Sequence, residues 1–258
     1  MKMLGEIYET GKKIELPSCF STPVRLDLIR EAFRTEQINK AQPYGTYPLA
    51  GKKGSGKVRH RRHKYKTLYG MGISRIPRTI LTRRGERFYF KGAFIPGTVG
   101  GRAAHPPKAV KKRLKMNKKV KKLALDGAIA ATASLELIKK RYKKIGNLER
   151  LKLPLIIDSS MLEKKPKEII AFLEKMLGFT IKREKKVRAG KGKMRGRCYK
   201  KRCKVLLVGA SSENVKRLRN YIDVAQTNHL NLSIIAPGGT PGRIIVWTTK
   251  AIEELKKK

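Results

Sequence analysis

The chain has 258 residues, 40% of them hydrophobic, which is enough for one large domain or two modest ones with a real core. Its 63 Lys and Arg against 19 Asp and Glu give a formal net charge of +44, at which self-repulsion opposes compaction unless a polyanion supplies counter-charge. The three cysteines, and the lack of a signal-peptide core or a run of about 18 apolar residues, argue against a disulfide-rich secreted protein and a membrane protein, so we expect a cytoplasmic protein with no membrane partner.

The first 40 residues predict a hairpin followed by a helix. Apolar positions alternate in residues 3–8 and 13–16, on either side of Thr10 and Gly11. Pro23 is compatible with a first helical position, because the amide hydrogen that proline lacks has no intrahelical partner there. Apolar residues then recur at helical spacing toward Lys40.

The second half alternates predicted helices and strands. Residues 117–142 have the spacing of one long helix, and its small central stretch GAIAATA should be its most buried part. Residues 153–158, 204–209 and 244–248 are continuously apolar and read as strands, with helices expected over 165–177, 213–220 and 249–255. Such an order predicts an α/β fold: a three-layer α/β/α domain with a mainly parallel central sheet.

The excess positive charge is concentrated in two stretches. Residues 37–125 hold 25 Lys and Arg against one acid, Glu86, and residues 182–204 hold 13 against Glu184. Within the first stretch, residues 49–107 lack core periodicity and predict a long extended basic loop inserted after the first helix. We therefore divide the chain into a globular α/β domain (1–48 and 108–258), the loop (49–107) and a basic, glycine-containing insertion in the globular domain (182–204).

The composition of both stretches favours RNA as the partner. Arg, Lys and His are interleaved with aromatic residues that can stack on unpaired bases, and glycines let phosphates approach the backbone. In the loop the predicted RNA-binding residues are Lys52, Lys53, Gly54, Gly56, Lys57, Arg59, His60, Arg61, Arg62, His63, Lys64, Tyr65, Arg102 and His105. In the insertion they are Arg188, Gly190, Lys191, Gly192, Lys193, Arg195, Gly196, Arg197 and Tyr199.

Motifs for catalysis or cofactor binding are weak by comparison. GKKGSGKV (51–58) approaches a nucleotide-binding P-loop, but Val58 stands where the magnesium-binding hydroxyl is needed, and no helix is predicted to follow. His60 and His63 with Cys198 and Cys203 lack the usual zinc spacing. Asp158 ends a strand, but the sequence DSS there is more simply a turn and cap. We predict no enzyme activity, no cofactor and no metal.

Several long motifs together resemble one protein family. They are TPVRLDLI, GSGKVRHRRHKYKTLYGMGISRIPR, VGGRAAHPP, DGAIAATA, RAGKGKMRGRCYK and LSIIAPGGTPGRIIVWT, which are spread over the whole chain. The chain resembles the universal large-subunit ribosomal protein L-four family in its archaeal and eukaryotic form. Cys198 and Cys203 lie at positions that the family is not expected to require.

The resemblance implies a structural constituent of the large ribosomal subunit. It would bind large-subunit rRNA early in assembly, contact several rRNA domains, and place its loop in the wall of the polypeptide exit tunnel. Implied partners are rRNA, neighbouring large-subunit proteins including the one across the tunnel constriction, and the nascent polypeptide. If the loop runs out and back, its midpoint lies nearest the tunnel, which predicts a tip formed by Tyr69, Arg75, Ile76, Arg78, Arg83, Arg84 and Arg87.

Composition alone leaves one alternative open. A general basic nucleic-acid-binding protein, such as a DNA-compacting factor, would have the same charge excess. It would bind duplexes of any sequence, whereas the ribosomal reading predicts preference for one folded rRNA fragment.

Overall fold

The computed structural model describes residues 3–54, 56–143, 145, 148–149, 151–181 and 183–257. The chain divides into two compact units. Unit 1 comprises Met1–Lys40 and Arg113–Lys258, and unit 2 comprises Ala41–Lys112. The boundaries therefore fall after residues 40 and 112, compared with the sequence-derived positions 48 and 107.

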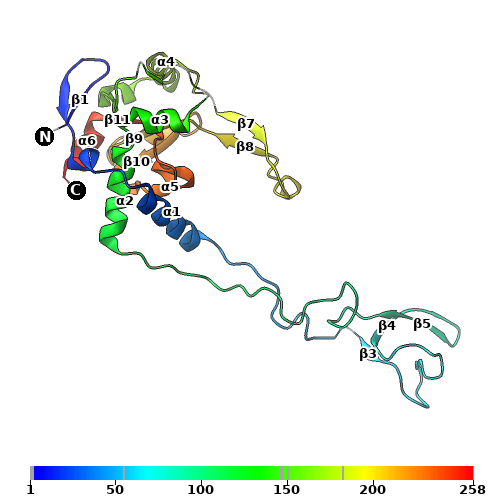
Figure 1. The fold of residues 1–258 in the computed structure, drawn as a ribbon. Helices are drawn as coiled ribbons and strands as arrows, with labels where there is room; N and C mark the ends of the chain where they lie inside the picture. The colour runs from blue at the N-terminus through cyan, green and yellow to red at the C-terminus, as the bar shows by residue number, and fades with distance from the viewer. Residues whose placement is uncertain are drawn as a thin grey trace. The chain divides into compact units, whose positions relative to one another are not determined.

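Four parallel strands form the centre of unit 1 (Figure 1): β6 (Leu155–Ile157), β9 (Val205–Gly209), β10 (Asp223–Gln226) and β11 (Ile244–Thr248). Their order is β10-β9-β11-β6, so the last strand in the sequence lies between two earlier ones. Every residue of β6, β9 and β11 is buried, as expected for a parallel sheet covered on both faces. The predicted α/β class with a parallel sheet is confirmed.

A short N-terminal hairpin extends this sheet. Strands β1 (Leu4–Glu6) and β2 (Lys13–Glu15) pair antiparallel, and Gly11 in the turn has a φ of +65°. The amide of Tyr8 donates to the carbonyl of Ile156 at 3.0 Å, which attaches the hairpin beside β6. The predicted hairpin is thus present at the predicted place.

Helices cover one face of the sheet around Trp247, which is fully buried. They are α1 (Leu26–Lys40), α2 (Lys118–Ala130), α5 (Leu232–Ile235) and α6 (Thr249–Lys256). Phe20, in the 3-10 helix η1 (Ser18–Ser21), meets the Trp247 ring edge-to-face at 5.6 Å.

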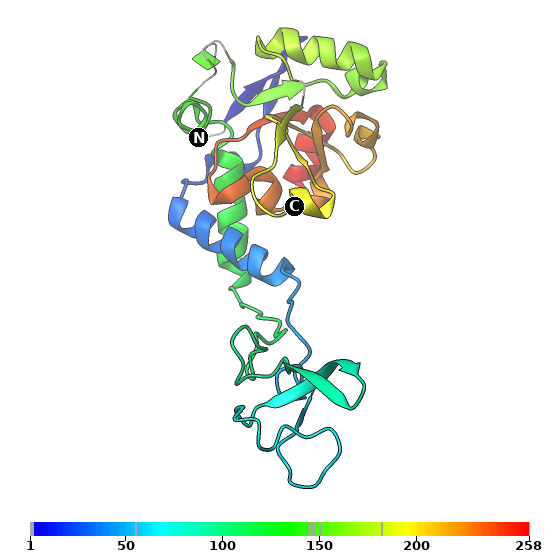
Figure 2. The ribbon, with the colours of Figure 1, turned by 90° about the vertical axis from the view of Figure 1, so that its right-hand side faces the viewer.

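The other face packs against α3 (Leu135–Arg141) and α4 (Pro166–Leu177). Leu173 and Leu177 of α4 are fully buried against Leu207 and Val246 of the sheet. Figure 2 shows α4 lying away from α1 and α2, across the sheet. None of the described helices combines the length and the apolarity that spanning a bilayer requires.

The helix predicted over residues 117–142 is two helices. The chain breaks between α2 and α3, where the hydroxyl of Thr132 donates to the carbonyl of Ile129 at 2.7 Å and competes with the helical pattern. The small residues before the break are buried as predicted: a Cβ at Gly127 would lie 3.4 Å from the carbonyl oxygen of Pro23. The segment before α1 lies against α2 at this point, and α1 begins at Leu26 rather than at the predicted Pro23.

Residues 213–220 do not form the predicted α-helix but a single 3-10 turn, η5 (Val215–Leu218). The side chain of Glu213 is held by the sheet instead, accepting hydrogen bonds from the Ala210 amide and the Thr248 hydroxyl, both at 2.7 Å. This leaves room only for a short turn before β10.

Unit 2 has a small sheet of its own, in contrast to the predicted loop without a core. Strands β3 (Lys57–Val58), β4 (Pro77–Arg84) and β5 (Arg87–Gly92) pair antiparallel in the order β3-β4-β5. Leu68 and Ala93 are buried beside it. Aromatic side chains of β5 supply the packing surface that the sequence analysis overlooked.

Candidate nucleic-acid interface

The hairpin β4–β5 turns at Gly85 and Glu86. Gly85 has a φ of +58°, which favours glycine, and Arg84 pairs with Arg87 across the turn. Beyond residue 80 every β4 side chain is exposed, including Leu81 at the register shift. The farthest point of this hairpin is therefore Gly85–Glu86. Ile76, which was predicted to lie at the tip, is half-buried and immediately precedes β4.

Arg78 is also placed differently from the prediction. Its side chain is buried, and its guanidinium donates to the carbonyl and hydroxyl oxygens of Ser74, the latter at 3.0 Å. A guanidinium with this many internal bonds orders the segment before β4. Arg78 is thus a structural residue of unit 2 and not part of its exposed cationic surface.

Residues 59–73 form an ordered loop closed by Thr67. Its hydroxyl donates toward the carbonyls of Arg59 and Arg61 at 2.9 and 2.7 Å, and the Leu68 amide donates to Arg59 at 2.7 Å. Arg62 is fixed on the outside, with its Nε donating to the hydroxyl of Tyr69 at 2.6 Å. The loop therefore presents cations in defined positions.

Aromatic rings and cations alternate over the surface between this loop and β5. Tyr65 meets Phe88 edge-to-face at 5.2 Å, and the cations of Lys66 and Arg83 lie 5.4 and 5.5 Å from the centre of the Phe88 ring. A cavity of about 820 Å³ opens beside them, and its lining includes Met71. Aromatic faces beside cations are what unpaired bases and their phosphates require.

The two legs of unit 2 pack backbone against backbone. A Cβ at Gly51 would lie 1.9 Å from the carbonyl oxygen of Ala103, and one at Gly45 would lie 2.7 Å from that of Pro107. Only glycine permits such approaches. Four predicted binding residues lie close to these contacts in the sequence and are exposed: Lys52, Lys53, Arg102 and His105.

The second basic stretch is a hairpin of unit 1, formed by β7 (Glu184–Val187) and β8 (Tyr199–Arg202) (Figure 1). Gly190 and Gly196 turn its loop with φ of +81° and +73°, on either side of the 3-10 helix η4 (Lys193–Arg195). Arg188 is half-buried, with its Nε donating to the carbonyl of Arg197 at 3.0 Å, so it orders the loop.

Most of the predicted binding residues are exposed. In unit 2 these are Lys52, Lys53, Gly54, Lys57, Arg61, Arg62, His63, Lys64, Tyr65, Tyr69, Arg75, Arg83, Arg84, Arg87, Arg102 and His105, and in the hairpin of unit 1 they are Gly190, Lys191, Lys193, Arg195, Gly196, Arg197 and Tyr199. Gly56, Arg59, His60 and Gly192 are half-buried. The Lys185 ammonium lies 4.0 Å from the centre of the Tyr199 ring. The exposed residues form two separate sets, one in each unit.

The described part of the chain contains no group of three His, Cys, Asp or Glu side chains arranged to hold a metal ion. His60 instead makes a hydrogen bond with the carbonyl of Ile73 at 2.8 Å, and Cys203 is half-buried against the core on the α3–α4 face of the sheet. Asp158 caps η3 (Ser159–Glu163), accepting from the Ser159 amide at 2.7 Å. That is the turn-and-cap role expected from the sequence.

Phe88 and Phe90 are the residues of this surface whose role the sequence analysis missed. In RFYFKG the two rings alternate with Tyr89 and Lys91, which is the period of a strand with one packed face. This alternation was overlooked because it is short and most of the neighbouring residues are charged.

Relatives of this chain among known proteins match it over nearly its whole length. Residues 14–258 match the model of the "Ribosomal protein L4/L1 family". The chain belongs to that family. It is 40% identical over 254 residues to the large ribosomal subunit protein uL4 of Nanoarchaeum equitans, covering 95% of this chain and 93% of that protein.

Two further family members match to a similar degree. The uL4 of Thermoplasma acidophilum is 40% identical over 257 residues, covering 96% of this chain and 94% of its own length. That of Methanocaldococcus jannaschii is 39% identical over 260 residues, covering 97% and 95%. The family match, over residues 14–258, includes all of unit 2 and most of unit 1.

Proposed function

We propose that this protein is a structural constituent of the large ribosomal subunit in the cytoplasm and has no catalytic role. The observation that carries the proposal is the near full-length identity of about two residues in five with proteins named large ribosomal subunit protein uL4. The charge of +44 gives the physical reason, because RNA phosphates would offset the self-repulsion of the free chain.

We propose two RNA contacts, one in each unit. Unit 2 presents exposed cations beside the rings of Tyr65 and Phe88, which suits unpaired bases, whereas Lys191, Lys193 and Arg195 of the β7–β8 loop suit a phosphate backbone. Binding at both would let the protein join several rRNA domains early in assembly, next to neighbouring large-subunit proteins.

Within the subunit, we assign unit 2 to the wall of the polypeptide exit tunnel, facing the protein across the constriction. Its exposed apolar side chains include Met71 and Leu81, which suit contact with a passing nascent chain. A photoreactive residue at position 81 should crosslink to a stalled nascent chain. A crosslink from position 191 with none from position 81 would contradict this assignment.

Sedimentation of the native protein tests the main proposal. It should migrate with the large subunit in a sucrose gradient, and in isolation it should prefer a folded large-subunit rRNA fragment to duplex DNA of equal length. A DNA-compacting protein would bind both equally. Plotted as log affinity against log salt concentration, RNA binding should have a slope steeper than about −3, because several phosphates are neutralised.

A further inference from the structure

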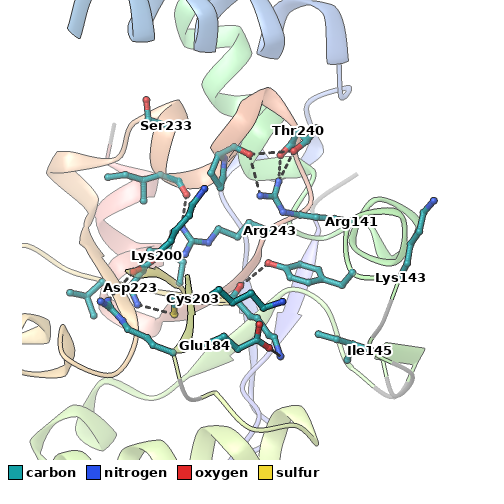
Figure 3. Close-up of a pocket in the computed structure, with 18 of the residues that line it drawn as sticks. Arg141, Lys143, Ile145, Glu184, Lys200, Cys203, Asp223, Ser233, Thr240 and Arg243 are labelled. Carbon is teal, nitrogen blue, oxygen red and sulfur yellow. Dashed lines mark hydrogen bonds and ion pairs between the residues drawn. The ribbon is translucent and has the colours of Figure 1, made fainter. Parts of the chain in front are cut away.

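A second cavity, of about 1190 Å³, lies within unit 1 (Figure 3). Residues at or beside the amino ends of β9, β10 and β11 form its inner wall, and the end of α3 and the β7–β8 hairpin form its rim. None of the loop residues 188–199 lines it. It is therefore separate from the loop contact proposed above, although Arg183, Lys186 and Lys200 on its lining belong to the same basic stretch (182–204).

Two arginines on the inner wall share one carboxylate. Arg243 is buried, with Nη1 donating to the carbonyl of Ile234 at 2.9 Å and Nη2 donating to one oxygen of Asp223. Arg183 donates to the other oxygen of Asp223 at 2.9 Å. Two guanidinium groups on a single carboxylate leave this wall with a net positive charge.

Arg141 adds a half-buried cation that is bonded to neutral acceptors. Its guanidinium donates to the hydroxyl of Thr240 at 2.9 Å and to the carbonyls of Thr240 and Pro237. Burial lowers the pKa of Arg141, although an arginine so placed stays charged. A desolvated cation without a carboxylate partner attracts an anion.

The rim carries further positive charge. Lys140, Lys143 and Lys200 are exposed and have no acidic partner within ion-pair distance in the described part of the chain. The acid on the rim, Glu184, already pairs with Lys204 at 2.9 Å. The cavity is therefore cationic from its rim to its inner wall.

The cavity also has apolar surface. Its lining residues include Ile145, Val224, Ile234 and Pro237. A simple inorganic anion needs only the cations, whereas a ligand with an apolar ring and phosphate groups would use both kinds of surface. Its volume is ample for one such ligand.

We propose that this cavity binds a nucleoside phosphate, with its base on the apolar surface and its phosphates on Arg141, Lys140 and Lys200. The nucleotide has two possible sources, an RNA strand or a free nucleotide. If the source is an RNA strand, this proposal rests on the proposed ribosomal function. If the source is a free nucleotide, it is independent of that function.

Lysine acylation of the full-length protein, followed by mass spectrometry, tests the site. ATP or a trinucleotide should protect Lys140, Lys143 and Lys200 saturably, while Lys164, Lys167 and Lys175 on or beside α4 stay reactive. Tripolyphosphate should protect them at least about tenfold more weakly, because it lacks the base and buries no apolar ring. Equal protection by tripolyphosphate, or protection of the α4 lysines to the same extent, would overturn the proposal.

Two triple variants with equal charge change complete the test. K140Q/K143Q/K200Q should lower affinity for ATP or the trinucleotide about tenfold, and K164Q/K167Q/K175Q should lower it less than about twofold. Equal losses would show that only net charge matters. Tighter binding of the trinucleotide identifies RNA as the source, and tighter binding of ATP identifies a free nucleotide. Sedimentation with the large subunit depends on the other contacts, so its loss or retention reports on the proposed function separately.

Discussion

Arg78 and Arg188 show that a basic residue in an RNA-binding segment can have an intramolecular role. Both lie in stretches rich in cations, yet the guanidinium of each donates hydrogen bonds to backbone carbonyls of its own segment. Arg84 and Lys191, from the same two stretches, are exposed and make no such hydrogen bond to the described part of the chain. Position in the sequence does not separate the two roles, whereas hydrogen-bond partners do.

Replacing Arg78 by Met should therefore loosen unit 2. The change leaves the oxygens of Ser74 without their donor, at a cost of about 1–3 kcal/mol in local stability. Amide hydrogen exchange over residues 74–93 would increase in the variant. Arg84→Met in the same strand is the control, and equal exchange in the two variants would contradict the role assigned to Arg78.

Asp158 gives unit 1 a pH-dependent contribution to stability. The hydroxyl of Ser160, followed by the Ser159 amide, lowers the pKa of Asp158 below its ordinary value. Because the folded-state pKa is the lower one, the contribution is complete above the unfolded value of about 3.9 and is lost as pH falls through the folded value.

Asp158→Asn should accordingly destabilise unit 1 slightly at neutral pH, because the neutral amide lacks the negative charge that the Ser160 hydroxyl and the Ser159 amide stabilise. The difference from the parent protein should shrink as the pH falls below about 4. Chemical denaturation at a series of pH values measures it. A difference that stays constant down to the lowest pH would mean that the carboxylate charge is not involved.

At the level of elements, the pairing of the two legs of unit 2 depends on glycine. Gly51→Ala would place a methyl group against the Ala103 carbonyl and should separate the legs. Limited proteolysis should then cut residues 45–53 faster. Gly97→Ala is a matched control, since a Cβ at Gly97 meets nothing within 4 Å. Equal cleavage of both variants would exclude a role for leg packing.

The elements that could be predicted from the sequence are those whose signal is local. Continuous apolar runs gave β9 and β11, and the helix beginning at Pro166 was found because proline and amphipathic spacing coincide there. The break after Ala131 was missed because the apolar spacing continues across it. The sheet of unit 2 was missed because few apolar residues form it.

The candidate interface was predictable in composition but not in arrangement. Charge counts and glycines located both basic stretches. Which cations are exposed, as Arg62 is, and which are buried, as Arg78 is, depends on long-range contacts that leave no spacing pattern. The cavity of unit 1 was unpredictable for the same reason, since Arg141, Arg183 and Arg243 come from separate segments.

At the level of the whole molecule, unit 1 is completed by segments on both sides of unit 2. Gly51 and Ala103 are in contact, so a short Gly-Ser turn can replace residues 52–102. The core clusters of unit 1 contain no residue from that stretch. The excised protein should unfold cooperatively in a thermal melt followed by circular dichroism, and loss of cooperativity would show that unit 1 depends on unit 2.

The position of β11 in the sheet has a consequence for how the protein is made. Because β11 lies between β9 and β6, the sheet has a gap at its centre until residues 244–248 have been synthesised. Unit 2 and its cations are complete on the growing chain long before that, by an interval on the order of ten seconds at typical elongation rates. During biosynthesis, the cations of unit 2 therefore become available for binding before the central sheet of unit 1 can be completed.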